Sequence, residues 1–370
     1  MNNIEMEKEH KGLGNLTEKE IYEIPNCLKK ALDQKNEIHQ VSNKIFGHKI
    51  AHIYIIGAGS SYHAGFAMSY MFNRITRIPT YPEYSMEFQY LIEPILTKND
   101  CVIALSQSGE TKDTIQSIEL AKELGCLNIG ITNNKDSTLS KVCDEHIFLQ
   151  CEEEKSVLAT KTYISELSVL ALLALEIASE KKSLNNEEHN QLIIELIRIP
   201  EKIHSILPNI HAKIKSYSKY FKFTTFCFIL GSGSDYATAM EASLKLKEGA
   251  RIFGQAYSTA EFPHGPITLA DSKTAIIAII PHEEDARRIN LLNLLRRIKE
   301  RNATIFAVYE GMQEENLPEL IDFGIMVPDT FKDLQPIVMI LAIQLLTLEI
   351  SRIKGINCDT PKFLSKISGI

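Results

Sequence analysis

The sequence predicts an α/β protein built from two tandem, doubly wound parallel sheets. Short apolar runs rich in β-branched residues alternate along the chain with amphipathic helical patterns, which is typical of parallel strands covered by helices on both faces. The chain also repeats itself, because the segment IYIIGAGSSY at 53–62 returns as CFILGSGSDY at 227–236. Each half therefore forms its own sheet, and ligands are expected at the carboxyl ends of the strands.

The elements follow the same order in both halves. Besides the strand that opens each repeat, the first half contains apolar runs at 101–105, 128–132 and 146–149 and helical patterns at 61–75 and 114–124. The second half contains apolar runs at 275–280, 304–308 and 323–327 and helical patterns at 237–248 and 286–300. Each half thus becomes a three-layer αβα sandwich of the flavodoxin-like or Rossmann-like kind.

At 370 residues the chain is long enough for two domains of ordinary size. A polar stretch at 179–188 is the expected linker; it leads into a helical connector at 191–217, and a last long helix is expected at about 333–353. The predicted domains are an N-terminal extension at 1–25, a first sheet domain at 26–185, a connector at 186–217, a second sheet domain at 218–354 and a C-terminal tail at 355–370.

Composition excludes several function classes. The formal net charge of −7 argues against a nucleic-acid-binding protein, whose surface would be basic. No apolar run reaches bilayer-spanning length, and the charged start at 1–14 is unlike a signal peptide. The seven cysteines and 11 histidines show no metal-ligand spacing, and the unpatterned cysteines indicate buried, reduced thiols. We therefore expect a cytoplasmic protein with no metal, nucleic-acid or membrane partner.

The stretch SQSGET at 106–111 is the strongest functional signal. It links an apolar run to a helical pattern, so it lies between a buried strand and the amino end of a helix. The first-turn N–H groups have no partner within the helix, and the helix dipole favours negative charge there. The side chains of Ser106, Gln107, Ser108 and Thr111 add uncharged donors, which suits a phosphate monoester. The alternative is that these side chains only cap the helix.

Each repeat opens with a Gly-x-Gly turn after its strand, which invites a dinucleotide-binding interpretation. That motif requires a third small residue, but Tyr62 and Tyr236 stand in its place and would obstruct helix–strand packing. No cofactor is therefore expected, and the glycines instead let the backbone approach a small ligand in contact with Ser60 and Ser61. In the second copy Asp235 replaces Ser61 and would repel a phosphate, so the two halves are expected to differ in function.

The second half carries charged residues on one helix and a histidine in a loop. Glu241, Lys245 and Glu248 lie on neighbouring turns of the expected helix, and His264 precedes Gly-Pro. Taken alone, these residues also fit a solvated charged face and a surface histidine. The C-terminal stretch at 360–367 carries apolar residues that favour docking over fraying.

Four segments occur in the order found in sugar isomerase (SIS) domain proteins: the turn at 106–111, LKLKE at 244–248, HGP at 264–266 and LSK at 364–366. The chain most resembles the isomerase half of the glucosamine-6-phosphate synthases, the glutamine:fructose-6-phosphate amidotransferases. The resemblance runs from about residue 19 to the C-terminus, so it covers nearly the whole chain. The phosphate turn is shared widely in the family, whereas the combination of Lys245, Glu248, His264 and Lys366 is more specific.

The resemblance implies a role for each of these residues. Lys366 would form a Schiff base with C2 of the open-chain ketose, which ammonia then displaces, and the nearby cation Lys245 would help to keep Lys366 partly neutral. Glu248 would carry a proton between C1 and C2, and His264, from the neighbouring subunit of a homodimer, would assist ring opening. The residues expected to bind the sugar phosphate are Ser60, Ser61, Ser106, Gln107, Ser108, Thr111, Val157 and Ser365.

The expected function is that of a phosphosugar aldose–ketose isomerase acting on fructose 6-phosphate and glucosamine 6-phosphate in amino-sugar metabolism. No glutaminase domain of the synthase kind is expected in this sequence, so the chain would be either an excised isomerase half or a stand-alone protein that uses free ammonia or a partner chain. Ala159 stands where synthases usually carry a serine that contacts the sugar, which would weaken or alter hydroxyl recognition. Two alternatives stay open: a stand-alone glucosamine-6-phosphate deaminase or fructosamine-phosphate deglycase, and a non-catalytic sensor of a sugar phosphate.

Overall fold

The computed structural model describes residues 12–282, 285–311 and 317–366, and the chain divides into two compact units. Within the described ranges the first unit comprises residues 24–154 and 161–200, and the second comprises residues 12–23, 155–160 and 201–366. Two of the predicted segments, the N-terminal extension at 1–25 and the C-terminal tail at 355–370, lie partly outside the described residues. Each unit contains its own sheet, in agreement with the repeat.

The first unit contains a five-stranded parallel sheet with the order β2-β1-β3-β4-β5. Its strands are β1 (His52–Gly57), β2 (Thr80–Tyr84), β3 (Asp100–Leu105), β4 (Leu127–Thr132) and β5 (Glu145–Phe148). Successive side chains of a strand face opposite sides of a sheet, and Ile53, Tyr54, Ile55 and Ile56 of β1 are all buried. Both faces of this sheet are therefore covered, as the uninterrupted apolar runs indicated.

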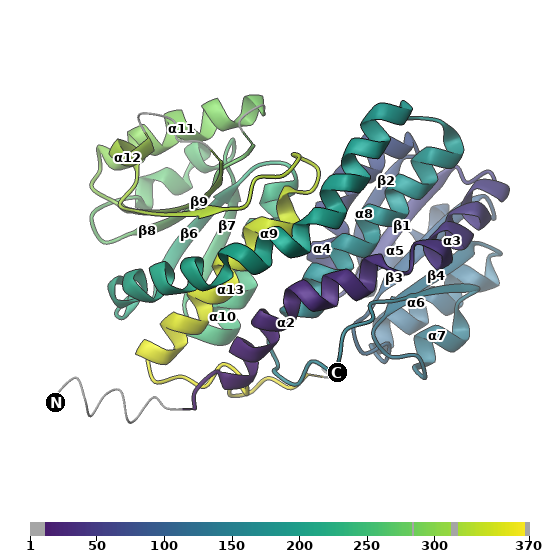
Figure 1. The fold of residues 1–370 in the computed structure, drawn as a ribbon, viewed down its shortest axis with the longest axis horizontal. Helices are drawn as coiled ribbons and strands as arrows, with labels where there is room; N and C mark the ends of the chain where they lie inside the picture. Colours follow the sequence, from purple (N-terminus) through teal and green to yellow (C-terminus); the bar gives the residue numbers. More distant parts are fainter. Residues whose placement is uncertain (1–11, 283–284, 312–316, 367–370) are drawn as a thin grey trace. The chain divides into compact units, whose positions relative to one another are not determined.

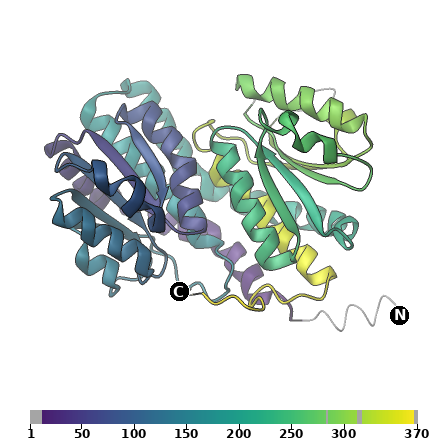
Figure 2. The ribbon, with the colours of Figure 1, turned by 180° about the vertical axis from the view of Figure 1, so that it is seen from behind.

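Helices cover the two faces of the first sheet (Figures 1 and 2). On one face α4 (Ser60–Thr76) and α3 (Lys35–Gly47) both pack on α8 (Lys161–Lys181). On the other face lie α5 (Ser85–Leu91), the short 3-10 helix η1 (Glu93–Ile95), α6 (Lys112–Glu123) and α7 (Thr138–Val142). A buried cluster beneath this second layer includes Tyr54, Phe88, Val102, Ile118 and Leu139.

The second unit repeats this plan with a parallel sheet in the order β10-β9-β8-β6-β7. Its strands are β6 (Phe226–Gly231), β7 (Phe253–Ser258), β8 (Ala275–Ile279), β9 (Thr304–Glu310) and β10 (Phe323–Val327). On one face α10 (Ser234–Ala250) packs on α13 (Gln335–Ile353). The prediction of two doubly wound parallel α/β domains is thus confirmed.

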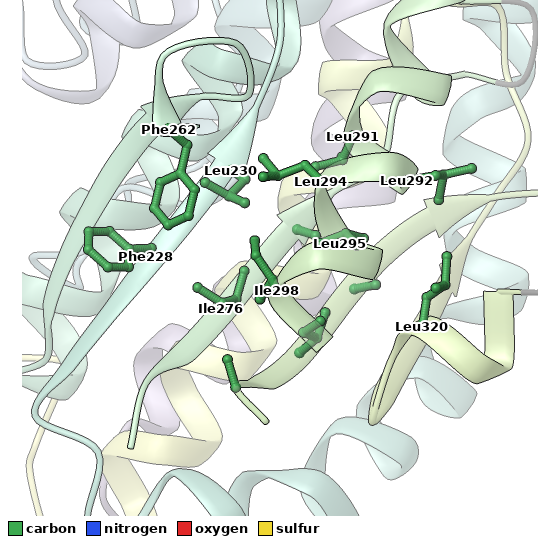
Figure 3. Close-up of a cluster of buried hydrophobic side chains, with 14 of the residues drawn as sticks. Phe228, Leu230, Phe262, Ile276, Leu291, Leu292, Leu294, Leu295, Ile298 and Leu320 are labelled. Carbon is green, nitrogen blue, oxygen red and sulfur yellow. The ribbon is translucent and has the colours of Figure 1, made fainter. Parts of the chain in front are cut away.

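The other face of the second sheet is covered by α11 (Ala286–Lys299) and α12 (Leu317–Leu320). Figure 3 shows the core under these helices, where Phe228 and Leu230 of β6 and Ile276 of β8 meet Leu295 of α11 and Phe262. Phe262 belongs to η3 (Phe262–His264), which is followed by η4 (Pro266–Leu269). This apolar anchor fixes the start of the loop that carries His264.

Two long helices contain residues of both units. These are α2 (Asn15–Leu32) and α9 (Asn186–Ser218), the latter followed by η2 (Lys219–Phe221). Helix α9 is one unbroken helix of 33 residues over the range expected for the connector, and the division between the two units falls within it, after Pro200. Its buried stripe includes Leu192, Leu196, Ile199, Ile203 and Leu207, the spacing of an amphipathic helix.

Two helices have the length and apolar composition of a membrane span, which the sequence analysis did not expect. They are α8 and α13, with mean hydropathies of 1.5 and 1.7 over their most apolar windows. In these windows 94% of the α8 residues and 89% of the α13 residues are buried within the protein. Helix α8 packs on α3 and α4, and α13 packs on α10 and on strands β9 and β10, so their apolar character is explained by their place in the core.

Candidate active site

The carboxyl edge of the first sheet carries two of the turns that the sequence singled out. Strands β1 and β3 pair in register, with Ile53 beside Cys101 and Ile56 beside Ala104. The turns at 57–61 and 106–111 therefore leave the sheet at the same edge. The strand order reverses at this pair, and open α/β sheets bind ligands in the crevice at such a reversal.

Hydrogen bonds within the turn at 106–111, hereafter the phosphate turn, hold its hydroxyls in place. Ser106 Oγ accepts from the Gly109 N–H at 3.0 Å and lies 3.0 Å from Thr111 Oγ1. Ser108 Oγ accepts from the Glu110 N–H at 3.2 Å. Thr111 stands at the N-cap position of α6, yet its side chain makes no capping hydrogen bond and therefore does not cap the helix.

The one acidic residue of the phosphate turn is engaged elsewhere. The Glu110 carboxylate accepts from the N–H and from the hydroxyl of Thr138, each at 2.8 Å. These two hydrogen bonds hold the pKa of Glu110 below its usual value. The carboxylate thus ties the phosphate turn to the start of α7.

Gly109 allows the phosphate turn to pack against the loop before α7. Its φ of +68° lies in the left-handed region, and a Cβ atom at this position would lie 2.3 Å from Ser137 Oγ and 2.8 Å from Thr132 Oγ1. Any larger residue would have to move these neighbours and accept a strained backbone.

Gly109→Ala is expected to destabilise the protein by about 2–4 kcal/mol, because it combines a left-handed alanine with a steric overlap. The matched control is Gly125→Ala, since Gly125 has a φ of +79° but its nearest neighbour, Lys98 Cβ, would be 3.7 Å from the new methyl group. The control should lose only about 1 kcal/mol. Thermal unfolding of both variants checks this, and equal losses would show that Gly109 is kept for its backbone alone.

Ser60 and Ser61 open α4 at the same sheet edge. Ser60 is half-buried, whereas Ser61 is buried and its hydroxyl donates to Glu166 Oε1 at 2.8 Å. An anion held by the Ser61 hydroxyl would have to replace Glu166 as its acceptor. Tyr62, which argued against a dinucleotide site, stacks on Tyr84 with ring centroids 3.6 Å apart.

At the equivalent edge of the second sheet, an arginine side chain occupies the space above the Gly-x-Gly turn. A Cβ atom on Gly233 would lie 1.3 Å from Nη1 of Arg287, so the guanidinium covers this turn. Arg287 Nε donates to both carboxylate oxygens of Asp285 at 2.8 Å. Asp235, the counterpart of Ser61, is 1% exposed, and its Oδ1 accepts no hydrogen bond from the described residues. The two edges therefore differ, as the aspartate in the second copy indicated.

Asp235 is expected to make stability fall as pH rises. Burial raises the pKa of this carboxyl from 3.8 to about 7, although the Arg287 charge opposes the shift. The folded state then binds a proton that the unfolded state has released, so stability is lost between about pH 4 and pH 7. Relative to the wild type, Asp235→Asn should gain about 3 kcal/mol between pH 5 and pH 8. Denaturant unfolding at both pH values measures this, and parallel curves would contradict it.

Helix α10 holds a buried charged group. Lys245 Nζ donates to Glu248 Oε2 at 2.7 Å and lies 3.4 Å from Glu241 Oε1. The side chains of Lys245 and Glu241 are 1% and 0% exposed, and that of Glu248 is 18% exposed. The alternative of a solvated charged face is therefore wrong. Burying charges is costly unless they are paired, and here the two carboxylates pair with the buried ammonium group of Lys245.

The loop at 155–160 is fixed by a carboxylate from α2. Glu20 accepts from the N–H groups of Lys155 and Ser156 and from the Ser156 hydroxyl. Glu20 is 3% exposed, so these bonds lie in a protected environment. Val157, a predicted ligand residue, donates its N–H to the Asp359 carbonyl at 2.9 Å. The loop is thus bound to α2 and to the C-terminal tail.

The C-terminal tail folds back on the second unit. The Asp359 carboxylate accepts from the N–H and the hydroxyl of Thr17, at 2.8 and 2.7 Å, and from the Leu16 N–H at 3.1 Å. Lys366 Nζ donates to the Ser156 carbonyl at 2.6 Å. The apolar side chains expected to dock do not do so in the described part of the tail, since Phe363 is 100% and Leu364 37% exposed; the tail is held by Asp359 and Lys366 instead. Lys366 therefore stands on the loop that Glu20 holds.

A cavity of about 580 Å³ joins the tail to the charged group of α10. It is lined by Glu248 and other residues at the end of α10, by residues 354–357 just after α13, and by Thr360, Pro361, Lys362 and Leu364 of the tail. Lys366 and Ser365 follow the lining segment directly. His264 lies apart in η3 and is exposed. The structure thus brings Glu248 and the tail to one cavity, with Lys245 buried behind Glu248, while the phosphate turn belongs to the first unit.

Sequence reasoning missed two residues that organise this region, Glu20 and Asp359. Each accepts hydrogen bonds from residues that are distant in the sequence. Glu20, for example, accepts from N–H groups 135 and 136 positions away. A usable signal existed for Glu20, since it shares a helix face with Thr17, Ile24 and Leu28, which are all buried. A lone carboxylate on an apolar helix face needs a partner.

Comparison with protein families gives one model that matches, the SIS domain, over residues 48–176 and 227–350, which is one match on each sheet. The glutamine--fructose-6-phosphate aminotransferase [isomerizing] of Clostridium acetobutylicum is 31% identical over 358 residues, covering 94% of this chain and 58% of that protein. The Thermotoga maritima protein of the same name is 36% identical over 318 residues, covering 85% and 51%. The chain therefore spans little more than half the length of these relatives.

Solved structures show a similarity of the same kind. The C-terminal domain of glucosamine-fructose-6-phosphate aminotransferase from Francisella tularensis matches with a TM-score of 0.85 and 27% identity, covering 93% of this chain and 98% of that one. The tagatose-6-phosphate ketose/aldose isomerase of Escherichia coli matches with a TM-score of 0.79 and 19% identity, covering 95% and 96%, which is a likeness of fold alone.

Proposed function

Because the chain belongs to the SIS domain family, we propose that it is a phosphosugar aldose–ketose isomerase acting on fructose 6-phosphate and glucosamine 6-phosphate. The observation that carries this proposal is the buried Lys245–Glu248 pair, whose carboxylate lines the same cavity as the tail that ends in Lys366. A proton-transfer group and a nucleophilic amine are the two groups that an imine-forming isomerase requires. Similarity to the Francisella tularensis domain, which covers nearly all of that chain, supports the same choice.

The phosphate turn is proposed to hold the 6-phosphate. Its hydroxyls are pre-positioned by the hydrogen bonds among Ser106, Ser108 and Thr111, and the free N–H groups at the start of α6 add donors. Gln107 contributes a half-buried carboxamide. No side chain of this turn has to lose charge or move far to accept a phosphate, since Glu110 is already engaged by Thr138.

Lys366 is proposed to attack C2 of the open-chain ketose. The neutral amine adds to the carbonyl carbon and water leaves, which gives a Schiff base; ammonia then displaces the lysine. The Ser156 carbonyl accepts one N–H of Lys366 and so fixes the position of the nitrogen. Because Glu20 holds Ser156 in turn, the nucleophile is positioned by a chain of contacts from α2. Val157 and Ser365, next to these groups, are proposed to contact the sugar.

Glu248 is proposed to move the proton between C1 and C2. Its Oε2 accepts from Lys245, and its Oε1 accepts no hydrogen bond from the described residues. One oxygen is thus used for orientation while the other is free to take and return a proton. Lys245 lies between two carboxylates, so it balances their charge as well as directing Glu248.

His264 is proposed to assist ring opening from the neighbouring subunit of a homodimer. The exposure of His264 in η3 supports an action on a partner, since an exposed imidazole is available to a second chain. The ammonia would come from free ammonium or from a glutaminase domain or chain. All seven cysteines are free thiols, six of them buried, which supports a cytoplasmic location.

Mixing two inactive variants tests the shared site. His264→Asn and Glu248→Gln are each expected to be inactive, while a mixed dimer regains one intact site. With random exchange of subunits the mixture should recover about a quarter of the wild-type activity, as a two-fold symmetric dimer requires. A mixed dimer verified by mass spectrometry but still inactive would argue against a contribution from the partner subunit.

The function itself is tested by turnover of the purified chain in both directions. One arm supplies glucosamine 6-phosphate and measures fructose 6-phosphate and ammonia; the other supplies fructose 6-phosphate with and without ammonium and measures glucosamine 6-phosphate and glucose 6-phosphate. Interconversion of ketose and aldose phosphates supports the proposal. Rapid ammonia release without the reverse reaction would identify a deaminase, and binding without turnover would identify a sensor.

A further inference from the structure

The cavity beside Glu248 carries an excess of positive charge. Four cations line it, Lys247, Arg251, Lys354 and Lys362, against the single carboxylate of Glu248. At neutral pH the lining therefore has three positive charges in excess. Its volume of about 580 Å³ is in the range of small-molecule sites in proteins.

Two of these cations are held in place by neutral groups. Lys247 Nζ donates to Ser243 Oγ at 2.7 Å, and Lys354 Nζ donates to the Thr224 carbonyl at 2.5 Å. Among the described residues no carboxylate forms an ion pair with any of the four lining cations. The protein thus fixes positive charge around a cavity without neutralising it.

Placement at helix ends explains only part of this charge. Lys247 and Arg251 stand at the end of α10 and Lys354 at the end of α13, where cations interact favourably with the helix dipole. Lys362 is on the tail and belongs to no helix. The tail, which Asp359 anchors, therefore adds a fourth cation to the three that stand at the ends of α10 and α13. Like charges repel, so bringing them together requires a compensating gain.

Partial burial adds to the free-energy cost of keeping these cations together. It lowers the pKa of Lys247 and of Lys354, since the charged forms lose hydration. An anion in the cavity would reverse both effects by pairing with the ammonium groups.

We propose that this cavity is an anion site for a small oxyanion group with two or more negative charges, a phosphate or a di- or tricarboxylate. The cavity is lined by residues of the second unit alone, whereas the phosphate turn belongs to the first unit. Because Glu248 shares its wall, the bound anion would lie beside the carboxylate to which the proposed function assigns proton transfer. The same chemistry could arrive as a free anion or as a second charged group on the sugar phosphate.

Binding of inorganic pyrophosphate tests the site without any turnover. Titration calorimetry in magnesium-free buffer should show binding that weakens as salt is raised. The double variant Arg251→Asn/Lys362→Gln should weaken it about 10- to 100-fold, since each lost charge contact is worth roughly threefold to tenfold. Asparagine is chosen because Arg251 has a φ of +51°, a conformation that asparagine tolerates.

Three control variants make the result specific. Arg251→Lys/Lys362→Arg keeps both charges and should bind pyrophosphate nearly as the wild type does. Lys215→Gln removes an exposed lysine of α9 and should have no effect. Ser108→Ala alters the phosphate turn, so unchanged pyrophosphate binding in this variant places the anion in the cavity. Equal thermal unfolding of all variants shows that the fold is kept.

The source of the anion is identified with a second probe, fructose 1,6-bisphosphate. If the anion belongs to the substrate, the bisphosphate should bind more tightly than fructose 6-phosphate, and the double variant should abolish this advantage. If the anion is free, pyrophosphate binds while the two sugars bind alike. The proposal is overturned if the double variant changes neither pyrophosphate binding nor the preference for the bisphosphate, or if neither is seen in the wild type. None of these results depends on isomerase activity.

Discussion

Lys366→Arg is expected to lower kcat by at least about 10³-fold, because arginine keeps the positive charge but cannot form a Schiff base. The guanidinium can still donate to the Ser156 carbonyl, so the tail should stay docked. Binding of fructose 6-phosphate, which is assigned to the phosphate turn, should change less than tenfold, as expected for a step that follows binding. The measurement is steady-state turnover together with calorimetric binding of the sugar.

The control for this variant is Lys215→Arg, on the exposed side of α9 in the same unit. It should leave turnover unchanged. If Lys366→Arg retained a tenth or more of the wild-type kcat, Lys366 would be a binding residue and the covalent step would have to be abandoned.

Glu248→Gln is expected to lower kcat by about 10²–10⁴-fold, the usual contribution of a group that transfers a proton in the rate-determining step. Glutamine keeps an oxygen that can accept from Lys245, and Lys245 remains paired with Glu241, so the fold should survive. The specific readout is incorporation of solvent deuterium at C1 of fructose 6-phosphate, followed by NMR. This incorporation should disappear while the sugar still binds.

Glu319→Gln, at an exposed position of α12, is the matched control for loss of a carboxylate. It should exchange deuterium at the wild-type rate. Exchange that persists in Glu248→Gln would assign the proton transfer to another group, and Glu241 would be the next to test.

The sequence predicted the central strands of both sheets and most of their flanking helices. Their signals were local: uninterrupted apolar runs such as that of β3, and the Gly-x-Gly turns that end β1 and β6. Strands β2 and β7, at one edge of each sheet, were not recognised. Pro82 lies within β2 and Gly254 within β7, and both residues weaken a strand signal although an edge strand tolerates them.

The parts of the candidate site that lie within one short segment could be singled out from the sequence. The phosphate turn and the Lys245–Glu248 spacing are both short motifs, and the structure gives each a defined geometry. Burial of Lys245 was not predictable, because the surrounding small and apolar residues of α10 were consistent with either face. The contacts of Asp359 with Thr17, 342 positions apart, depend on how the tail folds back, which no local pattern reports.

The most direct test of the account is reductive trapping of the Schiff base. The protein is incubated with fructose 6-phosphate and borohydride, digested and analysed by mass spectrometry. We expect a reduced sugar-phosphate adduct on the peptide that contains Lys366, absent from Lys366→Arg and retained in Glu248→Gln, because imine formation precedes proton transfer. A wild-type protein that turns over the sugar but carries no adduct, or carries it on Lys245 or another lysine, would contradict the central claim.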